Sequence, residues 1–304
     1  MTPAMDPIIL LGFGRSGTTW ISDIVSKALG GLILFEPLHP SVTGDSERLS
    51  YRPVDPASEQ GLRKYLDDVL GKRLRKMWLM RNHVPVRLEE IDPDFLGVLW
   101  NECAILGFKE IRCNFMLPWL VKTYGRRVIF IVRDPRSVAA SILKRRNFWE
   151  FGWPGTYLHF LAGTVDNPAF AGTEVAALSD YAHHLQSDVE RIAAMWAVTH
   201  AIALPQLAAL EIPAYRYEDF YIDPFATTRL MLSQLGRENA SLHPAHLFTP
   251  SMTTAKTVHG LFDFDKKIAA RDMSFFWDAT LDESDIAKIF AVTSRFGVDT
   301  DGWR

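Results

Sequence analysis

Short apolar runs, each followed by a polar or glycine-rich segment, recur along the chain. Runs of this length that are rich in Ile, Val, Leu and Phe are typical of strands buried on both faces of a sheet. They lie at residues 8–13, 32–37, 104–110, 127–135 and 212–219. Apolar positions recur with helical spacing at residues 18–29, 60–80, 115–124, 135–147, 186–210, 224–235 and 283–296. Because strands alternate with helices, we predict an α/β fold with a central parallel β-sheet of about five strands, flanked by helices and joined by right-handed crossovers.

The chain shows no internal repeat and no clear linker, so we expect residues 1–304 to form a single domain. Residues 147–180 break the pattern, because they are rich in Gly, Pro and aromatic residues. We predict an irregular excursion there, which serves either as a lid or as a plain surface loop.

Composition and charge narrow the classes of function. The net charge of −3 is close to balanced, which argues against a nucleic-acid partner. The two cysteines, Cys103 and Cys113, form neither a metal-binding spacing nor a disulfide framework, and this favours a cytoplasmic location. No uninterrupted apolar stretch reaches the roughly 18 residues of a membrane helix, so we expect no membrane span.

Polar groups follow all five predicted strands. In a parallel sheet the carboxyl ends of the strands meet at one edge, where ligands bind. Three of the groups at this edge are cations in a chain that is acidic overall, which indicates a ligand with two or more anionic groups. The residues at the strand ends are 12–17, Glu36, Lys109, Arg133, and Tyr217 with Glu218.

The segment GFGRSGTT, residues 12–19, is a glycine-rich turn between the first strand and the first helix. Free backbone N–H groups and the helix dipole at such a turn form an anion-binding cradle. Nucleoside triphosphatases have G-x-x-x-x-G-K-[ST] at this place, but here Thr18 stands where they have lysine, and the loop carries its cation as Arg15. The loop is therefore predicted to bind one phosphate rather than a metal-bound triphosphate.

Three strings together resemble the sulfotransferases that use 3′-phosphoadenosine 5′-phosphosulfate (PAPS). They are GRSGTTW at 14–20, VRDPRSVAASIL at 132–143 and RYEDF at 216–220, and residues 40–100 and 145–185 remain unmatched. The resemblance implies a P-loop-like sulfotransferase fold and metal-independent transfer of a sulfuryl group from PAPS, which leaves adenosine 3′,5′-bisphosphate (PAP). The arginine form of the loop is similar to the carbohydrate and tyrosyl-protein branches of the family.

The resemblance also implies residues that bind the donor. Arg15 would stabilise the charge that develops on the leaving phosphate. Arg133 and Ser141 would bind the 3′-phosphate, and Arg145 lies one turn after Ser141 on the same predicted helix face. The remaining donor-binding candidates are Ser16, Gly17, Thr18 and Thr19 for the 5′-phosphate and Tyr217 for the adenine, with core packing as the alternative role of Tyr217.

Glu36 is the candidate general base, because the arginine form of the family carries a glutamate after the first helix and the string FEP matches it. His39 is the alternative base. Lys109 is predicted either to contact the sulfuryl group or to be an ordinary solvated charge. Glu110 and Arg112 are weaker candidates for contacting the acceptor.

Other segments have two interpretations or a structural one. The basic run 71–81 is either a solvated helix face or a surface for an anionic acceptor or a membrane. Ser251 with Lys266 or Lys267 resembles a strap over the nucleotide. We expect solvated charges at Arg136 and Arg146, and core packing at Trp196 and Trp277.

The favoured function is transfer of a sulfuryl group to an acceptor hydroxyl of a carbohydrate or a small natural product. A phosphate-loop nucleotide kinase or nucleoside triphosphatase is the second hypothesis, and the missing lysine argues against it. A non-catalytic nucleotide-binding protein of the same fold is the third, and the presence of Arg15, Glu36 and Lys109 together argues against it.

Overall fold

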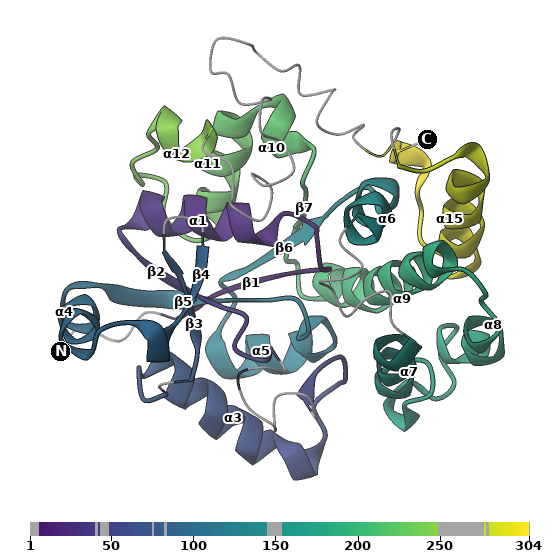
Figure 1. Ribbon diagram of the computed structural model, residues 1–304, viewed down its shortest axis with the longest axis horizontal. Helices are drawn as coiled ribbons and strands as arrows, with labels where there is room; N and C mark the ends of the chain where they lie inside the picture. The colour runs from purple at the N-terminus through teal and green to yellow at the C-terminus, as the bar shows by residue number, and fades with distance from the viewer. Residues whose placement is uncertain are drawn as a thin grey trace.

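The structure, a computed structural model, describes residues 6–39, 42, 49–74, 76–81, 84–144, 154–248, 277 and 280–303. Its centre is a seven-stranded sheet with the strand order β4-β3-β2-β5-β1-β6-β7 (Figure 1). The strands are β1 (Ile8–Gly12), β2 (Gly31–Phe35), β3 (Trp78–Arg81), β4 (Val84–Arg87), β5 (Ala104–Glu110), β6 (Val128–Val132) and β7 (Ala214–Arg216).

Five strands, β2, β5, β1, β6 and β7, pair in parallel and are the five that the sequence predicts. The apolar runs of β1 and β6 are buried at every position, which is why they lack the alternation of a half-exposed strand. The α/β fold with a parallel five-strand core is therefore confirmed.

The antiparallel pair β3–β4 extends the sheet beyond β2 and was not predicted. The expected helix 60–80 is wrong at both ends, because the observed helix α3 (Pro56–Leu70) begins at the N-cap Asp55 and ends at Gly71. Lys72 follows with a positive φ of 60°, which turns the chain away from the helix axis and toward β3. In its described residues, 71–74 and 76–81, the basic run is therefore a turn and a strand, not a solvated helix face.

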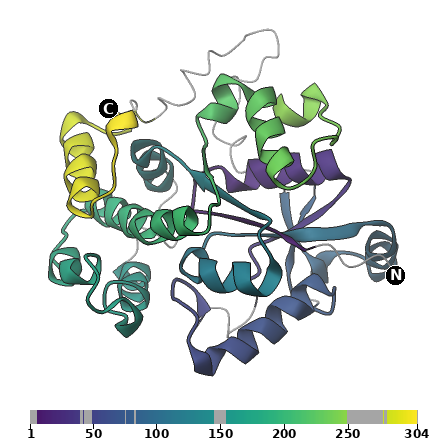
Figure 2. The same ribbon diagram turned by 180° about the vertical axis from the view of Figure 1, so that it is seen from behind.

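Helices cover both faces of the sheet (Figures 1 and 2). Helices α1, α10, α11 and α12 lie on one face, and α3 and α5 lie on the other, while α9 packs against α6, α7 and α15 at the β7 side. The helices besides α3 are α1 (Thr18–Leu29), α4 (Pro93–Glu102), α5 (Leu117–Tyr124), α6 (Pro135–Leu143), α7 (Pro154–Gly163), α8 (Ser179–His183), α9 (Asp188–Ala209), α10 (Asp219–Ile222), α11 (Pro224–Gln234), α12 (Pro244–Phe248) and α15 (Glu283–Arg295).

The sheet separates two hydrophobic cores, because successive side chains of a strand point to opposite faces. On β1, Ile8 and Leu10 join the core beneath α1, whereas Ile9 and Leu11 join the larger core on the side of α3, α5 and α9. The first strand is thus held from both sides, and the loop that follows it is held in place.

Helix α9 is the long core helix of the larger cluster. It begins with a capping box in which Ser187 and Glu190 each bind the other's backbone N–H. By length and composition α9 could cross a membrane, but 67% of its apolar window is buried inside the protein, which is the environment of a core helix. Trp196 on α9 is fully buried, so its predicted packing role is confirmed.

The described part of the segment 147–180 combines helices with a stretch of turns. It contains α7, the start of α8 and two short 3₁₀ turns, Pro168–Phe170 and Ala176–Leu178. Tyr157, Phe160 and Phe170 are buried in the main core, so these three aromatic side chains have a packing role. The excursion predicted for residues 147–180 stays a prediction, because helices and turns share its described part and residues 147–153 lie outside the described part of the chain.

Candidate active site

The carboxyl ends of the five parallel strands form one continuous edge. Backbone pairing runs one residue past the strands, since Glu36 N donates to Lys109 O (2.7 Å) and Tyr217 N donates to Val132 O (2.8 Å). Strands in a sheet are about 4.8 Å apart, so Glu36 after β2 and the loop after β1 are separated by about 10 Å along this edge. The structure thus brings the predicted site residues Glu36, Lys109, Arg15, Arg133 and Tyr217 to one edge.

The loop between β1 and α1 has a shape that depends on glycine. Gly17 has a φ of 83°, and a Cβ there would lie 1.9 Å from the ring of Tyr217. The residue is also the N-cap of α1 and supplies no capping side chain, so the first N–H groups of the helix, at Thr18 and Thr19, face the loop without an intrahelical acceptor. This arrangement is suited to holding a phosphate.

Arg15, in the middle of the loop, has a φ of 67°. A side-chain-bearing residue is uncommon in this left-handed region, and such backbone strain clusters at functional sites. Its Nε donates to the hydroxyl of Ser141 on α6 (2.8 Å), so the cation is held toward the β6 side of the loop.

Two buried polar atoms beside the loop have no hydrogen-bond partner among the described residues. They are Oγ of Ser16, whose side chain is fully buried, and Nε of Arg133. Buried polar atoms are nearly always hydrogen-bonded, and an exception calls for an explanation such as a ligand. The hydroxyl of Ser16 and the Nε–H of Arg133 can both donate, so they are consistent with a bound group that carries acceptor oxygens.

Arg133 connects the two halves of the predicted donor site. Its Nη1 donates to Arg15 O (3.0 Å), and its guanidinium lies 4.4 Å from the ring centre of Tyr217. Trp196 Nε1 in turn donates to Arg133 O (3.0 Å). The groups predicted for the 5′-phosphate and for the 3′-phosphate therefore form one connected cluster. Arg145 lies outside the described residues, as do Ser251, Lys266 and Lys267.

The amino end of α6 is already occupied by carboxylates. Asp134 is the N-cap and Pro135 the first helical residue, and the side chain of Asp134 accepts from Arg136 N (2.8 Å). Glu218 Oε1 accepts from Asp134 N (3.0 Å), and burial raises the pKa of Glu218. An anion near α6 would therefore be bound by the side chains of Arg133 and Ser141 rather than by the end of the helix.

The prediction of a solvated Arg136 is wrong. Arg136 is buried, forms an ion pair with Asp134 (2.8 Å) and lies 4.3 Å from the ring centre of Trp277. Trp277 has the packing role that was predicted for it.

Asn114 holds the start of the loop and could not be found from the sequence. Its amide forms two hydrogen bonds with the backbone of Gly12, accepting from N and donating to O (3.2 Å each), and it donates to Ile111 O (2.8 Å). A single asparagine between a strand and a helix carries no signal of such a contact, because its partner is 102 residues away.

Glu36 is part of a buried cluster of four charges. One carboxylate oxygen pairs with Lys109 Nζ, and the other accepts from Arg112 Nη1 (2.9 Å). Arg112 Nη1 also lies 3.3 Å from Glu110 Oε1. All four side chains are nearly inaccessible to solvent, so Lys109 is not the solvated charge of the alternative interpretation.

The pKa values in this cluster follow from burial and charge. Burial alone would raise the pKa of Glu36, but Lys109 and Arg112 outweigh it and lower the pKa to about 2. Burial lowers the pKa of Lys109, with the charge of Glu36 opposing that shift, and burial raises the pKa of Glu110. Glu36 is therefore an ionised carboxylate at neutral pH, and in this geometry both of its oxygens are occupied.

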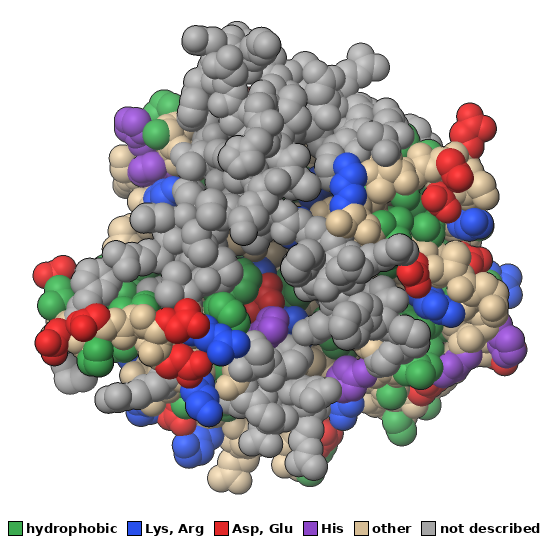
Figure 3. All heavy atoms as spheres, viewed as in Figure 1, with side chains coloured by type: hydrophobic (Ala, Val, Ile, Leu, Met, Phe, Trp, Pro, Cys, Tyr) green, Lys and Arg blue, Asp and Glu red, His purple; other side chains and the backbone are tan. Residues whose placement is uncertain are grey.

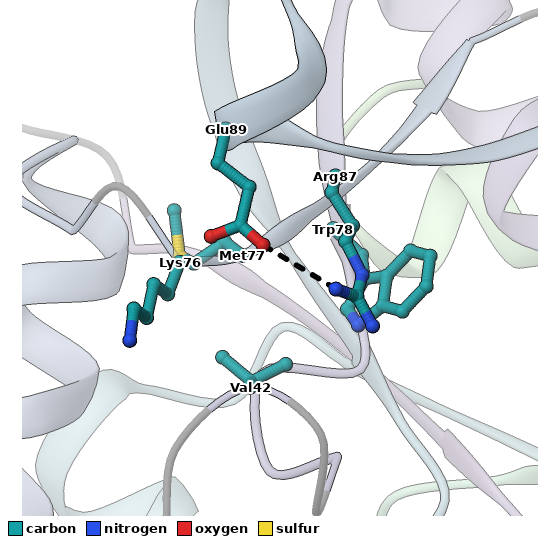
Figure 4. A pocket seen from close by; sticks show the side chains of 6 residues that line it. All are labelled: Val42, Lys76, Met77, Trp78, Arg87 and Glu89. Atoms are coloured by element: carbon teal, nitrogen blue, oxygen red, sulfur yellow. Dashed lines mark hydrogen bonds and ion pairs between the residues drawn. The ribbon is translucent and has the colours of Figure 1, made fainter.

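His39, the alternative base, follows Glu36 in a turn, and its backbone N–H donates to Glu36 O (3.0 Å). Its ring is 6.0 Å from that of Trp78 at the edge of the sheet. A small pocket there lies beside the end of β2, because Trp78 pairs with Phe35 (Figure 4). Its walls include an ion pair between Arg87 and Glu89 (3.4 Å), and the lining residues are Val42, Lys76, Met77, Trp78, Arg87 and Glu89.

No three His, Cys, Asp or Glu side chains are placed to hold a metal ion in the part of the chain that the structure describes.

In the space-filling view, acidic, basic and histidine side chains gather in a hollow near the middle of the face seen in Figure 1 (Figure 3).

Together, the fold and the strand-end cluster define an α/β protein with a glycine-rich phosphate loop and arginines in place of the loop lysine. Comparison with known families agrees with this class. The family model described as the sulfotransferase family matches residues 7–241. The chain belongs to the sulfotransferase family, and the protein is a sulfotransferase family enzyme.

Solved structures of similar proteins include several sulfotransferases. The sulfotransferase domain of the curacin biosynthetic pathway is 14% identical, with 97% of this chain and 99% of that chain covered and a TM-score of 0.43. The sulfotransferase domain of the Synechococcus PCC 7002 olefin synthase is 13% identical, with 98% and 97% covered and a TM-score of 0.43.

A third similar structure, retinol dehydratase in complex with androsterone and inactive cofactor PAP, is 14% identical, with 98% and 83% covered and a TM-score of 0.40. No curated protein matched the chain.

Proposed function

We propose that this enzyme transfers the sulfuryl group of PAPS to an acceptor hydroxyl and releases PAP. The acceptor oxygen forms a bond to sulfur, the bond between sulfur and the bridging oxygen of the 5′-phosphate breaks, and the acceptor proton passes to Glu36. The acceptor class remains our prediction of a carbohydrate or a small natural product.

The observation that carries this proposal is the connected cluster of Arg15, Ser141 and Arg133 beside the glycine loop. Two guanidinium groups are held at one strand edge by hydrogen bonds from Arg15 to Ser141 and from Arg133 to Arg15. The unpartnered Ser16 Oγ and Arg133 Nε beside them suit a ligand with phosphate oxygens. PAP and PAPS carry phosphate groups at the 3′ and 5′ positions of the ribose, which suits a site with two guanidinium groups in one cluster.

Each residue then has a role in the transfer. The loop backbone from Ser16 to Thr19 binds the 5′-phosphate, and Arg15 stabilises the charge on the leaving oxygen. Arg133 and Ser141 bind the 3′-phosphate, and Tyr217 supports both the loop and Arg133. Lys109, on the neighbouring strand β5, binds the sulfuryl group.

The protein cations Arg15, Lys109 and Arg133 supply the positive charge that phosphate-loop kinases obtain from a lysine and magnesium. We therefore propose that turnover proceeds without a divalent ion.

Thermal unfolding with added nucleotides tests the donor site. We expect PAP in the presence of a chelator to raise the melting temperature, by an amount that grows with PAP concentration. ATP with magnesium serves as the comparison. Stabilisation by ATP with magnesium alone would contradict the proposal and favour the kinase hypothesis.

A transfer assay separates an enzyme from a nucleotide-binding protein of the same fold. With sulfur-labelled PAPS and a panel of carbohydrate and natural-product hydroxyls, we expect label on at least one acceptor class and release of PAP. Binding of PAP without release of label to any acceptor class would favour the non-catalytic hypothesis.

A further inference from the structure

The buried cluster around Glu36 contains two cations that are held differently. Lys109 extends from β5, with its Nζ above the ring of Phe35 (4.3 Å), and it donates a hydrogen bond to Glu36 Oε1. Arg112 contacts both Glu36 Oε2 (2.9 Å) and Glu110 Oε1 (3.3 Å). The guanidinium is thus clamped between two carboxylates.

Glu110 is itself anchored in the backbone on both sides of the cluster. Its Oε2 accepts from Leu38 N (2.6 Å), in the segment that follows Glu36, and its Oε1 accepts from Ile111 N (2.8 Å). This carboxylate therefore joins the segment after β2 to the segment after β5. Arg112 is therefore paired with a carboxylate that the backbone holds in place, whereas Lys109 is a flexible side chain with a point charge at its end.

The position of Lys109 makes it the more available cation for a donor. Lys109 pairs with Leu10 of β1, two residues before the glycine loop, so its strand lies between the loop and Glu36. An anionic sulfuryl group at the loop would compete with Glu36 for the ammonium of Lys109. Arg112 lies farther along the chain and has Glu110 as a second partner.

On the basis of the proposed function, we propose that Arg112 is a positioning residue that holds the carboxylate of Glu36, and that Lys109 moves from Glu36 to the sulfuryl group when the donor binds. This exchange would free Oε1 of Glu36 for the acceptor proton while Oε2 stays bound to Arg112. Among the residues that the structure describes, the charged groups that face Glu36 are Lys109, Arg112 and, behind Arg112, Glu110.

The exchange resolves a difficulty with Glu36 as a base. A carboxylate with a pKa of about 2 is far from the near-neutral value that suits a general base. Withdrawal of Lys109 removes one of the two charges that lower this pKa, so the pKa of Glu36 rises only once the donor is in place. Donor binding and activation of the base would thereby be coupled.

The test of Arg112 compares Arg112→Gln and Arg112→Lys in the full-length enzyme. The readouts are the PAP dissociation constant and the pH profile of kcat at saturating PAPS. Loss of the cation raises the pKa of Glu36, so the acid limb of the profile should move to higher pH by about 1 unit in Arg112→Gln. We expect kcat at neutral pH to fall by about tenfold or more, because the carboxylate loses its orientation and this outweighs the gain in basicity. PAP affinity should stay within about twofold of wild type.

Arg112→Lys keeps the charge and loses the two-pronged contact. We expect its acid limb to return to the wild-type position, with kcat still reduced by about threefold or more because the carboxylate is less well held. Arg136→Gln is the matched control, since Arg136 is also buried and paired with a carboxylate. Its loss should lower stability and leave the acid limb in place.

The test of Lys109 compares two ligands that differ by the sulfuryl group. In Lys109→Met we expect PAPS to bind about tenfold more weakly, with PAP binding unchanged, because only PAPS presents the group that takes the ammonium. Equal changes for both ligands, or none, would overturn the release of Lys109.

An unmoved acid limb in a folded Arg112→Gln would overturn the positioning role. Should that variant fail to fold, a wild-type kcat in Arg112→Lys would overturn the positioning role instead, since the two-pronged guanidinium contact would then be unnecessary. Failure of the wild-type enzyme to turn over PAPS or bind PAP is a different result, which would overturn the proposed function itself.

Discussion

At the scale of single residues, the base and the donor cations carry the most direct predictions. Glu36→Gln keeps the shape of the side chain but removes the proton acceptor, so we expect kcat to fall by about 100-fold or more with PAP binding retained. The check is steady-state transfer from labelled PAPS beside calorimetric binding of PAP. His39→Gln is the control, because His39 is the alternative base. Near-normal turnover in Glu36→Gln together with a large loss in His39→Gln would reverse the assignment.

Arg133 is predicted to recognise the 3′-phosphate. Arg133→Ala should weaken PAP binding by about 10- to 100-fold, because a charge-assisted contact to a phosphate is lost. Adenosine 5′-phosphate, which lacks the 3′-phosphate, should lose much less. Calorimetry with both nucleotides measures the difference. Equal weakening would mean that Arg133 acts through the backbone of Arg15, to which it is hydrogen-bonded, and not through the 3′-phosphate.

At the scale of elements, the loop after β1 and the end of β7 depend on each other. Gly17→Ala would place a methyl group 1.9 Å from the ring of Tyr217, so either the loop or the tyrosine must shift. Gly172→Ala is a matched control, because Gly172 has a similar φ of 80° with no atom within 4 Å of the added carbon. We expect Gly17→Ala to lose about 1–3 kcal/mol more unfolding free energy than the control, together with PAP affinity. Chemical denaturation and PAP titration measure the two effects. Similar losses in both variants would show that only backbone strain matters at Gly17.

The elements that the sequence did not predict, the end of α3 and the edge strands β3 and β4, depend on contacts between distant residues. The predicted helix 60–80 extends beyond the observed end of α3, because the basic and apolar residues after Leu70 continue a plausible helical spacing. The structure ends α3 at Gly71, and Lys72 Nζ binds the carbonyl oxygens of Trp100 and Cys103 at the end of α4. This contact across 28 and 31 residues turns the chain, and the edge strands β3 and β4 then form against β2.

At the scale of the whole molecule, the pH dependence of stability has a defined contribution from His200 on α9. Burial lowers the pKa of this histidine to about 4, with its ring between Trp196 and Phe130. The unfolded chain binds the proton near pH 6.5 and the folded protein does not. Above about pH 6.5 His200 is neutral in both states and does not affect the free energy of unfolding. As the pH falls from 6.5 toward 4, protonation of the unfolded chain lowers the free energy of unfolding by up to about 3 kcal/mol.

Chemical denaturation of the wild type and of His200→Phe at several pH values between 7.5 and 4.5 measures this contribution. All other titrating groups are common to both proteins, so their contributions cancel in the difference. We expect the wild type to lose more stability than the variant on acidification. Parallel curves would show that His200 does not titrate as its burial implies.

The sequence by itself determined the five parallel strands, the glycine loop and the residues that follow each strand. Apolar runs and loop motifs are local, and the geometry of a parallel sheet carries their ends to one edge, so Arg15, Glu36, Lys109, Arg133 and Tyr217 could be named in advance. Only the tertiary structure decided which charges meet and how deeply they are buried. Glu36 lies 73 and 76 residues from Lys109 and Arg112. Pairing over such a distance, and the burial that shifts the pKa of Glu36, depend on strand order and side-chain packing, which no local pattern contains.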